Sequence, residues 1–316
     1  MEQALRDVFG EALKELGGEN SKVLALDADL SSTTRSAIFG DAYPQRFFNV
    51  GIAEANMVSI AAGLSTCGYI PFVCTFGFLL ALRSTDQIRS QLCYPNLNVK
   101  LAGGNGGLSG FGDGATHQTT TDLAFMNSMP NMQIIVPSDA VTLRWAIKKA
   151  AEINGPVYIR VPRVSAPVHH VSAHGLEFGK SILHRKGRDV SIVATGLMLD
   201  LSLEAAKELE ADGISASVIE MLTFKPFDQD GVIEAAKDTG AIVTAEEHSR
   251  YGGLYSLVSE TTAEYRPIPV LPVAIEDRFG ETGTYKQIMG ACGLTTEHIV
   301  QQSYRAIEMK KTKVYR

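Results

Sequence analysis

The sequence predicts an α/β protein with two open parallel-sheet domains, and three observations lead to this prediction. The chain has 316 residues, which is too long for one ordinary hydrophobic core and suggests about two domains. Apolar runs of strand length alternate with segments of helical periodicity, and this order favours parallel sheets covered by helices. The alternation is interrupted over 166–187, which divides the chain into two series.

The composition narrows the class of protein. Hydrophobic residues make up 45% of the chain and charged residues 20%, as in a globular protein. The net charge of −6, without a basic stripe, argues against a nucleic-acid partner. The amino-terminal stretch is charged, unlike a signal peptide, and no run of 18 apolar residues predicts a membrane span. The four cysteines lie in apolar segments without metal-ligand spacing, so we expect reduced core residues in a cytoplasmic protein: Cys67, Cys74, Cys93 and Cys292.

The first series, residues 1–165, is predicted to form one domain. An amphipathic helix over 3–17 is expected to end at Gly17-Gly18, and Asp139 is expected to cap a later helix. The expected strands cover 23–26, 47–50, 70–74, 98–102, 134–136 and 156–160, and further helices begin at Glu54, run over 79–92 and cover 122–127.

A linker over 166–187 and a second domain over 188–316 follow. The linker has no clear periodicity, and three of its histidines (His169, His170 and His174) are expected to be solvated rather than to bind a metal. The second domain repeats the alternation, with strands over 190–195, 216–221, 241–244 and 270–274 and helices over 198–209, 228–237 and 253–264.

One carboxylate stands out in the first domain. The strand 47–50 turns at Gly51, and a helix of small apolar residues then opens with Glu54 in its first turn. A glutamate at this place is either a partner of the helix dipole or a working group, and the local pattern leaves both interpretations open.

The glycine-rich segment 103–114 invites several interpretations. Its spacing fits neither the dinucleotide fingerprint nor a P-loop, and Gly112-Asp-Gly114 lacks the downstream Asn that a magnesium–diphosphate motif needs, so we predict no metal site. A flexible loop remains, which presents Asp113 and His117. These groups can hold sugar hydroxyls or transfer protons, although a turn with a surface histidine is an open alternative.

Together these motifs resemble the carboxyl-terminal half of a transketolase, namely its pyrimidine-binding domain and its C-terminal domain. The resemblance covers nearly the whole chain. The family's amino-terminal half is missing, so the chain looks like one subunit of a split, two-chain transketolase. The motifs occur in the family's order: Gly51-Ile-Ala-Glu54, Pro71-Phe-Val-Cys-Thr-Phe76, Arg83…Asp86-Gln-Ile88, Gly112-Asp-Gly-Ala-Thr-His-Gln118 and Pro137-Ser-Asp139.

The resemblance implies thiamine diphosphate as a cofactor shared with a partner chain, which also holds its Mg²⁺. Glu54 matches the glutamate that activates the cofactor's aminopyrimidine. Phe76 matches an aromatic that packs on the pyrimidine, Ile52 and Leu79 are expected to line the same pocket, and Asp29 matches a carboxylate near the thiazolium. The reaction implied is the transfer of a two-carbon ketol unit from a ketose to an aldose.

The resemblance also implies the substrate contacts. Asp113 and His117 match groups that hold the donor hydroxyls, and His117 is also a catalytic candidate. Arg163 and Arg6 match arginines that hold a sugar phosphate. Asn105 stands where many transketolases have a phosphate-binding histidine, so a different anionic sugar, such as a sulfosugar, is conceivable.

The sequence departs from the family at Leu79 and Thr85, where aromatic residues are frequent, so the pyrimidine pocket is expected to be partly aliphatic. Three alternatives stay open: the beta subunit of a 2-oxo acid dehydrogenase, half of a 1-deoxyxylulose-5-phosphate synthase, and a non-enzymatic regulatory remnant. The strand end at Glu246-Glu-His248 predicts a crevice in the second domain, although the resemblance assigns that domain to assembly. We expect this chain to form a heterotetramer with the partner subunit, and we expect it to be inactive when the partner is absent.

Overall fold

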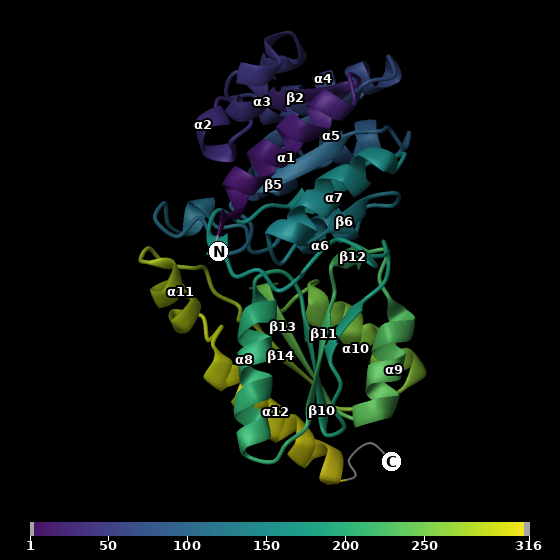
Figure 1. Ribbon diagram of the computed structural model, residues 1–316, viewed down its shortest axis with the longest axis vertical. Helices are drawn as coiled ribbons and strands as arrows, with labels where there is room; N and C mark the ends of the chain where they lie inside the picture. The colour runs from purple at the N-terminus through teal and green to yellow at the C-terminus, as the bar shows by residue number, and fades with distance from the viewer. Residues whose placement is uncertain (1–2, 313–316) are drawn as a thin grey trace. The chain divides into compact units, whose positions relative to one another are not determined.

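The structure is a computed structural model that describes residues 3–312 (Figure 1). The chain forms two compact units, Met1–Ala173 and His174–Arg316. Within the described residues, no helix combines the length and the apolar content needed to cross a bilayer.

The first unit contains a parallel sheet with its covering helices and a separate antiparallel pair of short strands, β1 and β8. Its strands are β1 (Gln3–Ala4), β2 (Val23–Asp27), β3 (Phe47–Asn49), β4 (Ile70–Phe76), β5 (Lys100–Gly104), β6 (Gln133–Ile135), β7 (Val157–Arg160) and β8 (Ser165–Ala166). Its helices are α1 (Leu5–Glu19), α2 (Ser31–Thr34), α3 (Ala37–Ala42), η1 (Pro44–Arg46), α4 (Glu54–Thr66), η2 (Leu79–Arg83), α5 (Thr85–Gln87), η3 (Ile88–Cys93), η4 (Ala115–His117), α6 (Asp122–Asn127) and α7 (Ala140–Glu152).

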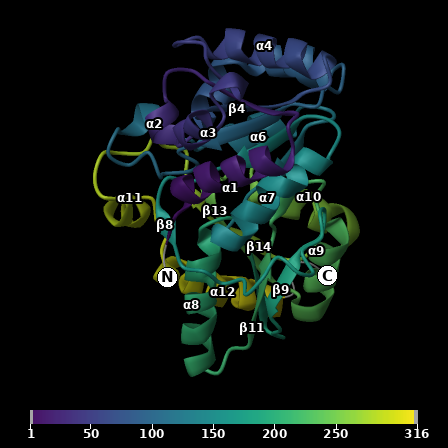
Figure 2. The same ribbon diagram turned by 45° about the horizontal axis from the view of Figure 1, so that its top comes forward.

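The strand order β6-β7-β5-β4-β2-β3 places the site-bearing loops at one edge of the sheet. Every pairing among these six strands is parallel, so their carboxyl ends lie together. The direction of the connections reverses after β3, which makes the junction of β2 and β4 a topological switch point, where ligands bind in open α/β sheets. Helices α1, α3 and α7 pack together on one face, and α4 packs on β4 with η2 (Figure 2).

Helix α1 does not end at Gly17-Gly18, and the sequence prediction was wrong on this point. The helix continues to Glu19. A Cβ atom at Gly17 would lie 2.5 Å from the Phe39 ring and 2.8 Å from the Tyr43 ring. Gly17 therefore allows α1 and α3 to pack closely and does not end the helix. The local sequence does not reveal this packing role.

The helix expected over 79–92 is also irregular. It consists of wide π-type turns in η2 and η3, separated by the short α5. Ser84, between η2 and α5, is fully buried with a non-helical backbone. Such wide turns are frequent at functional sites.

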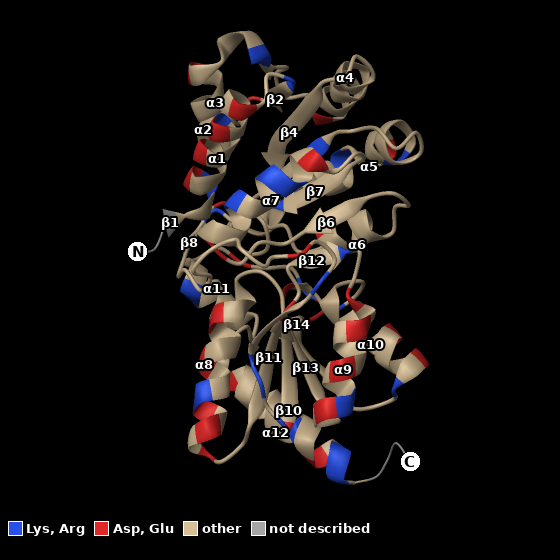
Figure 3. Ribbon diagram, turned by 45° about the vertical axis from the view of Figure 1, so that its right-hand side comes forward, with Lys and Arg blue, Asp and Glu red and all other residues tan. Residues whose placement is uncertain are grey.

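The second unit has a five-stranded sheet in the order β14-β13-β10-β11-β9. Helices α8 and α12 pack together, as do α9 and α10, and the charged residues of α8 and α9 lie on their outer faces (Figure 3). Its elements are β9 (Ile182–Arg185), β10 (Val190–Ala194), α8 (Met198–Ala211), β11 (Ala216–Glu220), β12 (Thr223–Lys225), α9 (Gln229–Thr239), β13 (Ile242–Ser249), α10 (Leu254–Tyr265), β14 (Val270–Ile275), α11 (Tyr285–Ala291) and α12 (Thr296–Lys311).

Strand β9 corrects the expectation of a featureless linker and of a purely parallel second sheet. It pairs antiparallel with β11, whereas β10, β11, β13 and β14 pair in parallel. Its half-exposed, mixed sequence hides it, because an edge strand needs no continuous apolar run. The α/β fold class itself is confirmed.

Two smaller expectations were also wrong. His170 is not solvated: it is 8% exposed, and its Nδ1 lies 2.9 Å from Asp139 Oδ2. Asp139 caps α7 as predicted and also accepts the backbone N–H of His170, and these hydrogen bonds hold its pKa below the usual range although burial opposes them. Cys67 is exposed, whereas the other three cysteines are buried.

Candidate active site

The carboxyl edge of the first sheet brings the predicted site residues to one region. Asp29 follows β2, Glu54 follows β3, Phe76 ends β4, Asn105 follows β5 and Arg163 follows β7. These strands are neighbours in the sheet, so five segments that are far apart in sequence end side by side.

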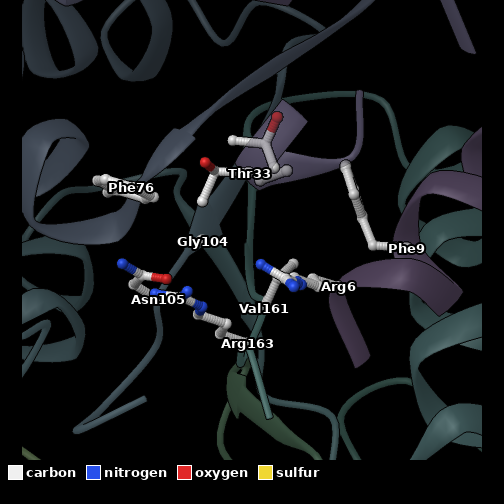
Figure 4. A pocket seen from close by; sticks show the side chains of 10 residues that line it. Arg6, Phe9, Thr33, Phe76, Gly104, Asn105, Val161 and Arg163 are labelled. Carbon is white, nitrogen blue, oxygen red and sulfur yellow. The ribbon is translucent and has the colours of Figure 1, made fainter. Parts of the chain in front are cut away.

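A recess opens between these segments. Its space, including the mouth, is about 290 Å³, and it is lined by residues of α1, α2 and the ends of β4, β5 and β7 (Figure 4). The lining residues are Arg6, Phe9, Thr33, Thr34, Phe76, Ala102, Gly104, Asn105, Val161 and Arg163.

A short strand pairing explains why Arg6 and Arg163 share this recess. Strand β1 pairs antiparallel with β8, and Leu5 N donates to Val164 O at 3.0 Å. The start of α1 is thereby tied to the segment after β7, so two arginines from opposite ends of the unit's sequence line one recess (Figure 4).

The recess is electropositive. Burial, followed by the charges of Arg35 and Arg163, lowers the pKa of Arg6, while Asp7 acts in the opposite direction. The Nε atom of Arg6 is buried and has no hydrogen-bond partner among the described residues. A buried donor of this kind is costly unless a ligand satisfies it.

Asn105 lies at the same recess. It is 3% exposed, its φ of 54° is left-handed, and its buried Nδ2 also lacks a partner within the described part of the chain. Asn tolerates this conformation better than most residues. Its amide offers both donors and an acceptor, so it suits a polar ligand group.

Glu54 is buried at the beginning of α4, with 5% of its surface exposed. One carboxylate oxygen, Oε1, lies 3.4 Å from Arg83 Nη1, and Arg83 is largely exposed. Arg83 is the last residue of η2, so the helical segment that follows Phe76 contacts Glu54 through this arginine. The sequence named Arg83 only as part of a motif and did not predict this contact.

His117 packs against two aromatic rings. Its ring centroid lies 6.0 Å from that of Phe76 and 5.5 Å from that of Phe78, both edge to face. Thr116 Oγ1 lies 3.0 Å from Nδ1 of the histidine. His117 is thus fixed beside Phe76, and Phe78, whose ring lies near both, supplements the aromatic wall of a site that has Leu79 next to it.

The glycine-rich loop contacts neighbouring segments through Asp113, Ser109 and Thr119, and the sequence did not predict these contacts. Asp113 Oδ2 lies 3.1 Å from Arg163 Nη1, and Arg163 N donates to Ser109 Oγ at 3.0 Å. At the far end, Arg160 Nη2 donates to Thr119 O at 2.6 Å. The two residues matched to different substrate contacts, Asp113 and Arg163, are therefore paired with each other here.

The loop after β2 is organised by a buried carboxylate that sequence reasoning missed. Asp27 accepts hydrogen bonds from Leu30 N at 2.6 Å and from the hydroxyls of Thr34 and Ser36 at 2.8 Å each. Burial raises the pKa of Asp27, and these hydrogen bonds oppose the rise. The network fixes the turn that places Thr33 at the recess. The sequence did not predict this network, because hydroxyl residues seven and nine positions after an Asp are too common to signal hydrogen bonds.

The remaining cofactor candidates differ in exposure. Asp29 is exposed with a left-handed φ of 65°, and its N donates to Asn49 Oδ1 at 3.2 Å. Leu79 is buried, whereas Ile52 is 75% exposed in the loop before α4.

Comparisons with known proteins agree with this geometry. Residues 1–168 match the family described as "Transketolase, pyrimidine binding domain", and residues 179–299 match "Transketolase, C-terminal domain". A 6-deoxy-6-sulfo-D-fructose transketolase subunit of Clostridium sp. is 39% identical over 98% of this chain and 96% of its own length. A putative transketolase C-terminal section of Methanocaldococcus jannaschii is 38% identical over 98% and 97%.

A solved structure described as a split gene transketolase, inactive beta4 tetramer, superposes with a TM-score of 0.89. It is 47% identical and covers 97% of this chain and 99% of its own. The chain thus spans nearly the full length of relatives that are themselves subunits or sections of transketolases. It belongs to the transketolase family, as a pyrimidine-binding domain followed by a transketolase C-terminal domain.

Proposed function

We propose that this chain is the pyrimidine-binding subunit of a two-chain, thiamine-diphosphate-dependent transketolase, which moves a two-carbon ketol unit from an anionic ketose to an aldose. One observation carries the proposal: Glu54 is buried at the switch-point edge of the sheet, yet only Oε1 has a partner among the described residues. Its other oxygen, Oε2, is not one of the buried atoms that lack a partner, so it faces outward from a buried side chain and is open to a ligand.

The residues present fit an aminopyrimidine. A carboxyl group can hold a proton at a ring nitrogen, and Phe76 with Leu79 provides a buried apolar surface for a flat ring. Thiamine diphosphate, when bound, supplies the electron-sink chemistry that breaks and forms the carbon–carbon bond. This chain's contribution is to hold the proton at the ring nitrogen through Glu54 and to keep water from the ring.

The other residues are assigned to the sugar. Asp113 and His117 are proposed to bind donor hydroxyls, and His117 to move protons at them, because its ring is fixed and its Nδ1 is engaged by Thr116. Arg6, Arg163 and Asn105 are proposed to bind the anionic end. Asp29, exposed at the sheet edge, is assigned to the side of the cofactor that faces the partner.

The proposal includes a partner of the amino-terminal transketolase type, which holds the diphosphate and its Mg²⁺ in a heterotetramer. Its support is that relatives named as subunits or as a split gene product match this chain end to end, and one of them is described as inactive without mention of a second chain. A cytoplasmic location fits the three buried free cysteines.

The test is ketol transfer by the purified chain, alone and after mixing with an amino-terminal partner subunit. We expect no transfer by the chain alone and full transfer by the mixture. Glu54→Gln in the mixture should lower the rate by about 10²–10⁴-fold, the range for a lost proton-transfer group. Asp41→Asn, at an exposed position of α3, is the matched control and should leave the rate unchanged. Transfer by the single chain, or a fully active Glu54→Gln complex, would overturn the proposal.

A further inference from the structure

The charges around the recess do not cancel. Arg35 Nε lies 2.5 Å from Asp7 Oδ1, and Arg163 pairs with Asp113. Arg6 forms no ion pair with a carboxylate among the described residues, so it is the one of these three guanidinium groups that is not paired. The carboxylate of Asp27 lies behind the lining, hydrogen-bonded to Thr34, and burial raises the pKa of this carboxyl group, which disfavours its charged form.

This charge is also fixed. Among the ten residues that line the recess, only the two arginines ionise, and arginine stays protonated at every pH that proteins tolerate. Asn105, Thr33 and Thr34 offer neutral hydrogen-bonding groups. His117 packs against Phe76 and Phe78 and is not one of the residues that line the recess.

A ligand that enters the recess therefore meets one unit of uncompensated charge. A singly charged oxyanion neutralises it. A dianion brings a second negative charge that has no counter-ion in the lining, close to the carboxylates of Asp113 and Asp7, and an unpaired charge in a partly desolvated site is costly.

The donors also come from several directions. Arg6 projects from α1, Asn105 from the end of β5, Arg163 from the segment after β7, and Thr33 from α2 (Figure 4). Groups that converge from four separate segments suit a tetrahedral headgroup with three oxygens better than a planar carboxylate, which takes its hydrogen bonds in one plane.

We propose that this recess selects a sugar with a singly charged tetrahedral headgroup, a sulfonate, over one with a phosphate dianion. The proposal rests on the proposed function, because it assigns the recess to the sugar's anionic end, and it adds a charge rule that family membership does not supply.

The first test uses the purified chain and three small probes: methanesulfonate, methyl phosphate and acetate. Binding is followed by calorimetry at pH 8 and at pH 5, on either side of the second phosphate pKa of about 6. We expect methanesulfonate to bind at least about fivefold more tightly than methyl phosphate at pH 8, with little change at pH 5. Methyl phosphate should bind more tightly at pH 5, as a monoanion, and acetate should be weakest.

Tighter binding of methyl phosphate than of methanesulfonate at pH 8 would overturn the proposal. So would the absence of binding by any probe, because the recess would then not be an anion site.

Two variants locate the effect in the recess. Arg6→Gln removes the uncompensated charge and should abolish binding of both methanesulfonate and methyl phosphate. Asn105→His adds a titratable cation and should raise methyl phosphate affinity near pH 6, where the new histidine is protonated.

Arg188→Gln is the control, because this arginine is 82% exposed in the second unit, and circular dichroism of each variant checks the fold. Identical probe affinities in Arg6→Gln and wild type would overturn the proposal.

The last experiment separates this inference from the proposed function. The two-chain complex is given ketose donors that differ only in a terminal sulfonate or phosphate. A kcat/KM ratio in favour of the sulfonate sugar supports the inference. Equal or reversed ratios refute it while ketol transfer itself stands, and no transfer with either sugar refutes the proposed function instead.

Discussion

Each of the two units places a buried glutamate next to a helix N-terminus, and the two are used in opposite ways. In the second unit, Glu246 of β13 accepts the backbone N–H groups of Leu254 and Tyr255 at 2.6 and 2.8 Å, one on each carboxylate oxygen. In the first unit, Glu54 begins α4 itself, and its one ion pair among the described residues is the 3.4 Å contact with the exposed Arg83.

The difference shows how a working carboxylate can be told from a structural one. Glu246 satisfies two of the donors that every helix leaves unpaired at its start, so both of its oxygens are committed to the fold. Glu54 is also buried, at 5% exposure against 0% for Glu246, but its Oε2 has no partner among the described residues. Burial next to a helix N-terminus is shared, and the hydrogen bonds of the carboxylate oxygens distinguish the two residues.

The largest effect on folding is expected for Glu246→Gln. The amide can accept through one oxygen only and turns a donor toward the second N–H, so we expect a loss of about 2–4 kcal/mol in the free energy of unfolding. Urea denaturation of the purified chain measures it. Glu276→Gln, which breaks the exposed pair with Arg250, should cost less than about 1 kcal/mol. Equal losses in both variants would show that Glu246 is not a committed cap.

The two ends of strand β5 also differ. Its carboxyl end leads to Asn105 at the recess, whereas its amino end begins with a buried lysine, Lys100. The Lys100 side chain is fully buried, donates to Ile153 O at 2.7 Å and Gly155 O at 2.8 Å, and has a pKa that burial lowers to about 7. The folded chain therefore binds fewer protons than the unfolded chain between pH 7 and about 10.4, the ordinary lysine pKa.

Stability is consequently expected to rise with pH from about 7 to about 10 on account of this group, and to lose that slope in Lys100→Met. Thermal unfolding at pH 7, 8 and 9 measures the slope against Lys148→Met, which removes an exposed lysine paired with Glu19. If the slopes of the two variants do not differ, Lys100 is charged in the folded chain and its proton is not released on burial.

The smallest effect is expected for Arg83→Gln. Its side chain is 59% exposed, so the ion pair with Glu54 is screened by water and should contribute less than about 1 kcal/mol. Ketol transfer by the two-chain complex should change less than about fivefold. A loss as large as that of Glu54→Gln would mean that the glutamate is committed to Arg83 after all.

The alternation of strands and helices predicted a parallel sheet in the first domain, but it was the resemblance to transketolases that brought Asp29, Glu54, Asn105 and Arg163 together as site candidates. The structure places all four after neighbouring strands of one sheet. Their roles toward cofactor and sugar stay predictions, since they come from resemblance and not from contacts.

Contacts between distant segments were beyond the sequence. The pairing of Asp113 with Arg163 spans 50 residues, and the hydrogen bond from Arg160 to Thr119 spans 41. Neither side chain signals its partner, because Asp and Arg are as often solvated as paired. His170 was therefore interpreted as solvated, and the contacts of the glycine-rich loop with Arg160 and Arg163 were not predicted.

Helix α1 carries Arg6 at its beginning and packs closely against its neighbours at two glycines, Gly10 and Gly17. A Cβ at Gly10 would lie 2.6 Å from Arg35 O, and at Gly17 2.5 Å from Phe39, so both positions are clamped against the segment that forms α3. Arg6 and Gly17 are eleven helical steps apart, roughly 16 Å along the axis. A bulky side chain at Gly17 would push the far end of α1 away from α3, and the strain would fall on the β1–β8 pairing that holds Arg6 at the recess. Packing at one end of α1 is thus coupled to the position of the arginine at the other end.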